Sequence, residues 1–123
     1  MPEIKSSSAQ GMEENLKKAV AEMLVLSLLS REDMHAPQIT RSLEEGSGGA
    51  LTISSPYLLF YRLIEKGCIL EAYKKIAPDG RRRQYYQITE DGRRHLADLK
   101  AAYRRVSAGV EQLLERGSEP DGK

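Results

Sequence analysis

Five basic side chains lie close to a single turn signal in the second half of the chain. Pro, Asp and Gly at positions 78–80 favour a tight turn. The flanking runs 69–76 and 83–88 are rich in β-branched and aromatic residues, as strands are. The sequence therefore predicts a β-hairpin whose tip must meet solvent or an anion, because so many like charges repel one another. These cations, which we expect to contact DNA phosphates, are Lys74, Lys75, Arg81, Arg82 and Arg83.

A short helix is expected immediately before this hairpin. Ser55 can cap a helix by accepting a bond from a free backbone N–H, and Pro56 is tolerated at the first helical position. Apolar residues then recur at helical spacing, and Gly67 supplies the end. The pattern predicts a helix from Ser55 to Lys66 with one buried face.

The opposite face of this helix carries the second group of candidate DNA contacts. A major groove admits a helix, and the residues at the start of a recognition helix contact base edges. For Tyr57, at the edge of the buried face, packing and DNA contact both remain open. The candidates are Ser54, Ser55, Tyr57, Leu58, Tyr61 and Arg62.

Charge is unevenly distributed along the chain. With 19 Lys and Arg against 18 Asp and Glu, the formal net charge is only +1. Residues 74–105 hold ten cations and four anions, a net charge of +6, which leaves nine cations and fourteen anions, or −5, elsewhere. This distribution predicts one anion-binding surface on an otherwise acidic body.

No arrangement of residues indicates catalysis or metal binding. The sequence has no GxSxG, Walker, HExxH or CxxC motif. His35, His95 and Cys68 have no spacing typical of a metal site. We therefore expect a protein that is not an enzyme and that uses no metal and no cofactor.

Cysteine use and hydropathy bear on the compartment. A single Cys excludes an internal disulfide and suits a reducing environment. The most apolar stretch, residues 19–29, is too short to cross a bilayer. We expect a cytoplasmic protein with no membrane contact.

The order of the predicted elements indicates a fold. Helices are expected at 12–30 and 35–45, followed by the flexible GSGGA connector, the Ser55 helix and the hairpin. This is the winged helix-turn-helix order. The prediction is a mainly α protein with a small β-hairpin, organised as a disordered tail (1–11), a winged helix-turn-helix domain (12–89), a C-terminal dimerisation helix (90–116) and a second disordered tail (117–123).

The last helix carries a heptad-like seam. Thr89 is its expected cap, and Glu90 and Asp91 lie in its first turn, where the helix dipole favours acids. Because the first helix is apolar almost all round, we expect both helices to form a homodimer interface. The alternative is that the last helix folds back on its own domain. The interface candidates are Leu16, Val20, Leu96, Leu99, Tyr103, Val106, Val110 and Leu113.

Three stretches resemble the PadR family of transcriptional regulators, in its short form with one C-terminal helix. They are LKKAVAEMLVLSLLS, SSPYLLFYRLIEKGCI and RRRQYYQITEDGRRHL, within a similarity that runs from Leu16 to Arg116. The matching positions are Tyr57, Arg62, Leu63, Gly67, Tyr86, Thr89 and Gly92. The sequence departs from the family pattern at Ala36, Pro37 and Gln38 and at Ser54, Ser55 and Pro56.

The resemblance implies a homodimer of winged helices that binds double-stranded DNA at a palindromic operator. It also implies repression that a small hydrophobic or aromatic effector relieves. The alternative from another class is a winged-helix protein-interaction module that uses its basic hairpin on an acidic partner. An enzyme is a third and weaker alternative.

Overall fold

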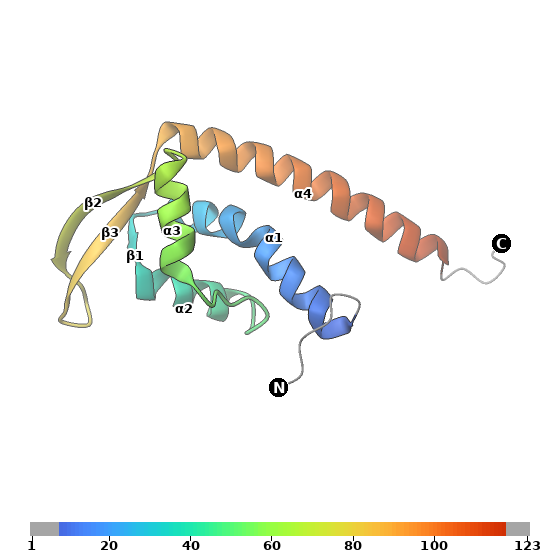
Figure 1. Cartoon of the computed structure of the whole chain (residues 1–123), viewed down its shortest axis with the longest axis horizontal. Coiled ribbons are helices and arrows are strands. Elements are labelled where there is room, and N and C mark those ends of the chain that lie inside the picture. The colour runs from blue at the N-terminus through green and yellow to red at the C-terminus, as the bar shows by residue number, and fades with distance from the viewer. Residues whose placement is uncertain (1–7, 118–123) are drawn as a thin grey trace.

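A computed structural model describes residues 8–117 of the chain, and within them it forms four helices and three strands (Figure 1). In chain order the elements are α1 (Ala9–Leu29), β1 (Met34–His35), α2 (Ala36–Gly46), α3 (Pro56–Glu65), β2 (Ile69–Ile76), β3 (Arg82–Ile88) and α4 (Glu90–Gly117). The mainly α winged helix-turn-helix fold predicted from the sequence is confirmed. The hairpin of β2 and β3 (residues 69–88) is the wing.

The sheet is antiparallel, with β3 in the centre and the order β1-β3-β2. In the wing, Ile69 lies opposite Ile88 and Ile76 lies opposite Arg82. The two-residue strand β1, which the sequence analysis did not predict, pairs His35 with Tyr85. Its pairing ties the segment before α2 to the wing, so the wing is joined to the helical body from both sides.

One hydrophobic core lies where the helices meet the sheet. It takes side chains from every helix, and the start of α4 closes it through Leu96. The fully buried large side chains are Phe60, Leu26, Leu29, Ile39, Leu63, Ile69 and Val25. Burying such side chains stabilises a fold by about 1.5 to 3 kcal/mol each. This core fixes the position of α3 relative to the wing.

Helix α1 begins three residues earlier than the expected start at Met12. The Ser8 hydroxyl accepts a hydrogen bond from the Gly11 N–H (2.9 Å) and caps the helix. Residues 9–11 are therefore helical rather than part of a disordered tail, whereas residues 1–7 and 118–123 of the expected tails lie outside the described residues. Within 8–117, no helix is both long and apolar enough to span a membrane.

Helix α2 has a cap that was not predicted from the sequence. The His35 Nδ1 accepts a bond from the Gln38 N–H, and the Gln38 side chain accepts one from the His35 N–H (both 3.4 Å). This reciprocal pair is a capping box, with His35 in the place usually held by Ser or Thr. The helix therefore begins at Ala36, and His35 is its cap rather than its first residue.

Helix α3 has the expected place but not the expected cap. The Ser55 side chain makes no capping hydrogen bond. Pro56 still starts the helix, because its fixed φ suits the first helical position and its missing N–H needs no partner. Gly67 ends the segment with a φ of 75°, as predicted from its position after the last apolar residue.

The junction between β3 and α4 is held by Thr89. Its hydroxyl donates to the Gly67 carbonyl (2.6 Å) and accepts from the Gly92 N–H (3.0 Å), which confirms the expected cap of α4. The Thr89 N–H also donates to the Cys68 carbonyl (2.9 Å). These bonds join the start of α4 to the α3–β2 turn, and they set the direction in which α4 leaves the body (Figure 1).

Gly92 is the position in this junction where a side chain cannot fit. A Cβ there would lie 2.1 Å from the Cys68 carbonyl oxygen and 2.8 Å from a side-chain carbon of Ile88. We predict that Gly92→Ala lowers the free energy of unfolding by on the order of 3 kcal/mol, because backbone must move to relieve the overlap. Denaturant unfolding followed by circular dichroism measures this.

Gly46→Ala is the matched control, because nothing lies within 4 Å of a Cβ at that position. The control should change stability by less than about 1 kcal/mol. Equal stability of both variants would contradict the proposed tight packing at Gly92.

Candidate nucleic-acid interface

Helix α3 has one buried and one exposed face. Leu59, Phe60 and Leu63 are buried in the core. On the other face, Tyr57, Leu58 and Tyr61 are 64%, 58% and 59% exposed, and Arg62 is exposed as well. The outward positions of Leu58, Tyr61 and Arg62 agree with the sequence prediction.

Aromatic contacts hold this helix against the sheet. The Phe60 ring lies 5.0 Å from the ring of Tyr86 and 5.9 Å, edge to face, from that of Tyr57. Tyr57 therefore packs through one edge and remains exposed over most of its surface, so the two roles left open for it are compatible. Ser54 and Ser55, just before the helix, are also exposed.

The register of the wing divides its cations between two faces. Residues directly opposite each other in an antiparallel pair point to the same side. Arg82 lies opposite Ile76, and Lys74 lies opposite Gln84. By strand alternation, Arg82 and Lys74 share the face of Tyr86, which packs on α3. Two of the five predicted cations thus project on the same side of the sheet as α3.

The cations of the opposite face already have partners within the wing. Arg83 donates to Asp79 Oδ2 through Nη2 (2.7 Å) and Nε (3.2 Å). The same carboxylate accepts from the Arg81 N–H (3.0 Å), and these bonds hold the pKa of Asp79 below its ordinary value. The Lys75 ammonium lies 4.7 Å from the centre of the Tyr85 ring. Lys75 and Arg83 therefore stabilise the wing itself.

Tyr85 corrects one expectation from strand alternation. Alternation along β3 would bury Tyr86, on the side of Ile88, and leave Tyr85 in solvent, but both are buried, at 5% and 4% exposure. Tyr73 stacks on Tyr85 with ring centres 5.3 Å apart, and the His35 ring meets it edge-on at 5.2 Å. The unpredicted strand β1 supplies this cover on the second face of the sheet.

Asp33 and His35 brace the wing, and neither was a candidate from the sequence. Asp33 accepts hydrogen bonds from the Tyr73 hydroxyl (2.8 Å) and from the Gln87 side-chain amide (3.3 Å). The His-Ala-Pro-Gln sequence at 35–38 was the available signal, because Pro in the first turn and Gln at the third helical position mark a helix start. Both residues orient the wing from the side facing away from α3.

A cleft of about 170 Å³ joins the two groups of candidate contacts. Tyr57 from the first turn of α3 lines it together with Arg82 from β3, and the start of α2 forms another wall. In Figure 1 the N-terminal end of α3 and the tip of the wing lie toward the same side of the molecule. The structure therefore brings the exposed face of α3 and the free cations of the wing onto one surface.

The structure splits the predicted dimer seam of α4 into two parts. Leu96 is 6% exposed and belongs to the core of its own domain, which corrects its assignment to a subunit interface, and Leu99 packs partly on the same core. The remainder of the seam is largely exposed. Its members are Tyr103, Val106, Val110 and Leu113, joined on α1 by Leu16, while Val20 is half-buried.

Helix α1 also needs less external cover than its composition indicated. Val25, Leu26 and Leu29 in its C-terminal half are buried by the rest of the domain. Its N-terminal half leaves Met12 and Leu16 more than half exposed. On these two helices, the uncovered apolar side chains therefore lie in the N-terminal half of α1 and on α4 from Tyr103 onward.

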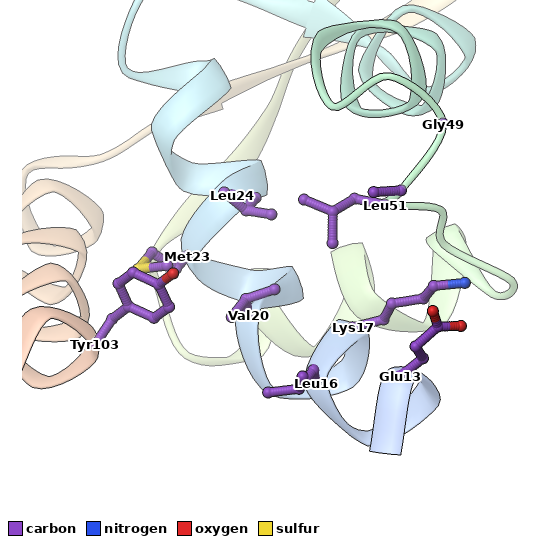
Figure 2. A pocket seen from close by; sticks show the side chains of 10 residues that line it. Glu13, Leu16, Lys17, Val20, Met23, Leu24, Gly49, Leu51 and Tyr103 are labelled. Carbon is purple, nitrogen blue, oxygen red and sulfur yellow. The ribbon is translucent and has the colours of Figure 1, made fainter. Parts of the chain in front are cut away.

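A larger cavity of about 510 Å³ opens beside α1 (Figure 2). Leu16, Val20 and Leu24 form one wall, Leu51 of the α2–α3 connector faces them, and Tyr103 reaches in from α4. Of the four methionines of the chain, Met23 lines the cavity. The polar edge of the cavity consists of Glu13 and Lys17 (Figure 2).

Residues 8–117 contain no cluster of three or more His, Cys, Asp or Glu that could hold a metal ion. Burial raises the pKa of the Cys68 thiol, which makes it a poor nucleophile.

Fold and site together define a winged helix-turn-helix protein in which the exposed face of α3 lies beside a basic wing. The sequence model of the PadR-like family of transcriptional regulators matches residues 25–98. The chain therefore belongs to this family, whose members are transcriptional regulators rather than enzymes. The resemblance seen in the sequence is confirmed.

Similar proteins include two solved structures. A PadR-like regulator of Bacillus cereus is 28% identical, with a TM-score of 0.70 over 81% of this chain and 96% of the other. A PadR-family regulator of Eggerthella lenta is 29% identical, with a TM-score of 0.71 over 86% and 91%. An uncharacterized protein of Lysinibacillus sphaericus is 28% identical over 75% of this chain and 85% of its own.

His35 gives the site a pH-dependent stability. Burial first, and the nearby Arg83 guanidinium second, lower the pKa of His35 below its ordinary 6.5. The unfolded chain then binds a proton more tightly than the folded chain. We predict that the free energy of unfolding is highest above pH 6.5 and falls as the pH drops below that value.

His35→Asn should reduce this fall, because Asn can still cap α2 but does not titrate. Urea unfolding of both proteins at about pH 7.5 and about pH 5.5 measures the difference. The same loss of stability in both proteins would contradict the role given to His35.

Proposed function

We propose that this transcriptional regulator is a sequence-specific repressor that binds a palindromic operator as a homodimer. The observation that carries the proposal is the shared surface of α3 and the wing, where Tyr57 and Arg82 line one cleft. The local charge supports it, because residues 74–105 carry a net +6. Binding to chromosomal DNA would require the cytoplasmic location expected from the sequence.

In this proposal α3 enters the major groove and the wing contacts the backbone. The start of a recognition helix is where side chains reach base edges, which assigns this role to Ser54, Ser55, Leu58 and Tyr61. Arg81 and Arg82, near the wing tip, would contact phosphates or the minor groove, as would Lys74. Lys75 and Arg83 would add to the local field while bracing the wing.

The exposed seam of α4 supports the homodimer. Val106 and Leu113 are 62% and 67% exposed, which is unusual for a regular row of apolar side chains on a long helix. A second copy related by a two-fold axis would bury both rows at once. Two α3 helices related by the same axis would then read two inverted half-sites, and so a palindrome.

The cavity beside α1 supports release by an effector. Its apolar walls and the Glu13 and Lys17 edge suit a small hydrophobic or aromatic compound with one polar end. Leu51 belongs to the connector that leads into α3, so a bound compound could shift the recognition helix. Titration of the protein–operator complex with aromatic amphiphiles tests this, with Leu51→Trp as a variant that fills the cavity.

The second candidate is a protein-interaction module. The exposed apolar side chains of α3, above all Leu58, favour it, because monomeric surfaces rarely gather such groups. Binding to duplex DNA with a steep salt dependence would separate the two candidates. If each dimer neutralises about six to ten phosphates, the log–log slope of affinity against salt should be about −5 to −9.

Arg82→Ala and Tyr61→Ala should have different effects on DNA binding. Phosphate contacts act on every sequence, so Arg82→Ala should weaken operator and random DNA alike and make the salt slope shallower by about one for each phosphate that is no longer neutralised. A base contact acts on one sequence, so Tyr61→Ala should lower the operator-to-random ratio by about fivefold to a hundredfold. Competition titrations against both DNAs measure these changes.

Glu65→Ala, exposed in the last turn of α3, is the control and should leave both affinities nearly unchanged. The assignment of base contacts to α3 and of phosphate contacts to the wing is overturned if Tyr61→Ala leaves the operator-to-random ratio unchanged while Arg82→Ala lowers it strongly.

Val106→Asp tests the homodimer. A charge in the centre of a desolvated seam should cost several kcal/mol, so the variant should sediment as monomer or aggregate. Ala108→Asp is the matched control, because Ala108 is exposed two residues further along α4, toward the opposite face of the helix. A Val106→Asp protein that remains a dimer of unchanged stability would exclude α4 as the interface.

A further inference from the structure

The first part of the recognition surface lacks the side chains that usually read DNA bases. Residues 52–61 have the sequence TISSPYLLFY, with no charged residue, no His and no Asn or Gln. Arg62 is the first cation of α3, and it lies almost two turns after the start of the helix at Pro56. The groups available at the start of α3 are therefore hydroxyls and apolar side chains.

Each base presents a different partner in the major groove. Guanine is read by Arg or Lys, adenine by Asn or Gln and cytosine by Asp or Glu, whereas thymine is distinguished by contact between its 5-methyl group and an apolar side chain. The start of α3 has no Arg or Lys for guanine, no Asn or Gln for adenine and no Asp or Glu for cytosine. It does have an exposed apolar side chain, Leu58, that could contact a thymine methyl group.

We propose that Leu58 and Tyr61 recognise thymine methyl groups and that each operator half-site contains the corresponding A·T pairs. This inference rests on the proposed function and adds the chemistry that α3 recognises. The two side chains are 58% and 59% exposed and lie three residues apart, hence on the same face of the helix. Leu59 and Phe60 between them are buried, which fixes that face outward.

The spacing of the two side chains limits where the thymines lie. Residues three apart on a helix are about 5 to 6 Å apart at Cβ, and successive base pairs are about 3.4 Å apart. Leu58 and Tyr61 therefore read thymines one or two base pairs from each other. Contact removes the leucine side chain and the methyl group from water together, which is worth about a fourfold gain in affinity for each methyl group.

The contacts assigned to the wing do not depend on these methyl groups. Arg82 and Lys74 lie on strands, on the side of the sheet facing α3, and their charges suit phosphates. Replacing thymine by uracil removes only the methyl group and leaves the base pair and the phosphate unchanged. This substitution therefore separates the affinity that comes from methyl contacts of α3 from the affinity that comes from the charges of the wing.

The experiment begins by selecting bound duplexes from a random library with the full-length protein. Each thymine of the selected half-site is then replaced by deoxyuridine, and affinity is measured for each duplex. We expect a loss of about fourfold at one or two thymines in each half-site and no loss at the others.

Leu58→Ala identifies the side chain responsible. With this variant, replacement of the thymine that Leu58 reads should no longer change affinity, because the methyl group then has no apolar partner. Folding should be preserved, since the side chain is exposed. Leu70→Ala, at a 40% exposed leucine on β2, is the matched control and should retain the full sensitivity to uracil.

The outcomes distinguish this inference from the proposed function. Selective duplex binding with no loss at any uracil would overturn the reading of thymine methyl groups and leave the DNA-binding function standing. Sensitivity to uracil that is equal in the protein and in Leu58→Ala would overturn the role of Leu58. Failure to bind any duplex would overturn the proposed function and this inference with it.

Discussion

The hydrogen bonds of Thr89 are the constraint on which the arrangement of this molecule depends. The hydroxyl joins the turn after α3, through the Gly67 carbonyl, to the first turn of α4, through the Gly92 N–H. The backbone N–H of Thr89 donates a further hydrogen bond to the Cys68 carbonyl. A single residue thus connects α3, the base of the wing and α4. Because Gly92 allows the backbones to approach closely, these three elements keep a fixed relation to one another.

The wing shows how one set of charges can serve two purposes. Strand alternation places Lys74 and Arg82 toward the α3 side and Lys75 and Arg83 on the other. The second pair neutralises Asp79 and covers an aromatic stack, so these cations stabilise the hairpin before any ligand arrives. Because that stack and the Asp33 hydrogen bonds are already formed, the proposed binding of an anion by the first pair would cost less conformational entropy.

Local signals in the sequence predicted most of the elements but not how they cover one another. Gly67, Thr89 and the turn at 78–80 act through backbone geometry that neighbouring residues determine, and the structure confirms all three. The burial of Tyr85 depends on β1, a two-residue strand too short to give a periodic pattern. Leu96 continues a seam on its helix, yet it is buried because that helix starts against the core. In the candidate site, the sequence indicated the cations, whereas their division between two faces required the register.

The length of α4 has a mechanical consequence. Its 28 residues make a rod about 42 Å long, and its contacts with the hydrophobic core come from Leu96 and Leu99 in the first three turns. A rotation of about 5° at that base would move the far end by about 4 Å, which is close to the rise of one base pair. If α4 joins two subunits, small changes in packing near Tyr103 would be amplified into a change in the distance between the two recognition helices. A change in the packing beside Tyr103 would thus alter the spacing of the two copies of α3, so that it would no longer match the spacing of the half-sites on DNA.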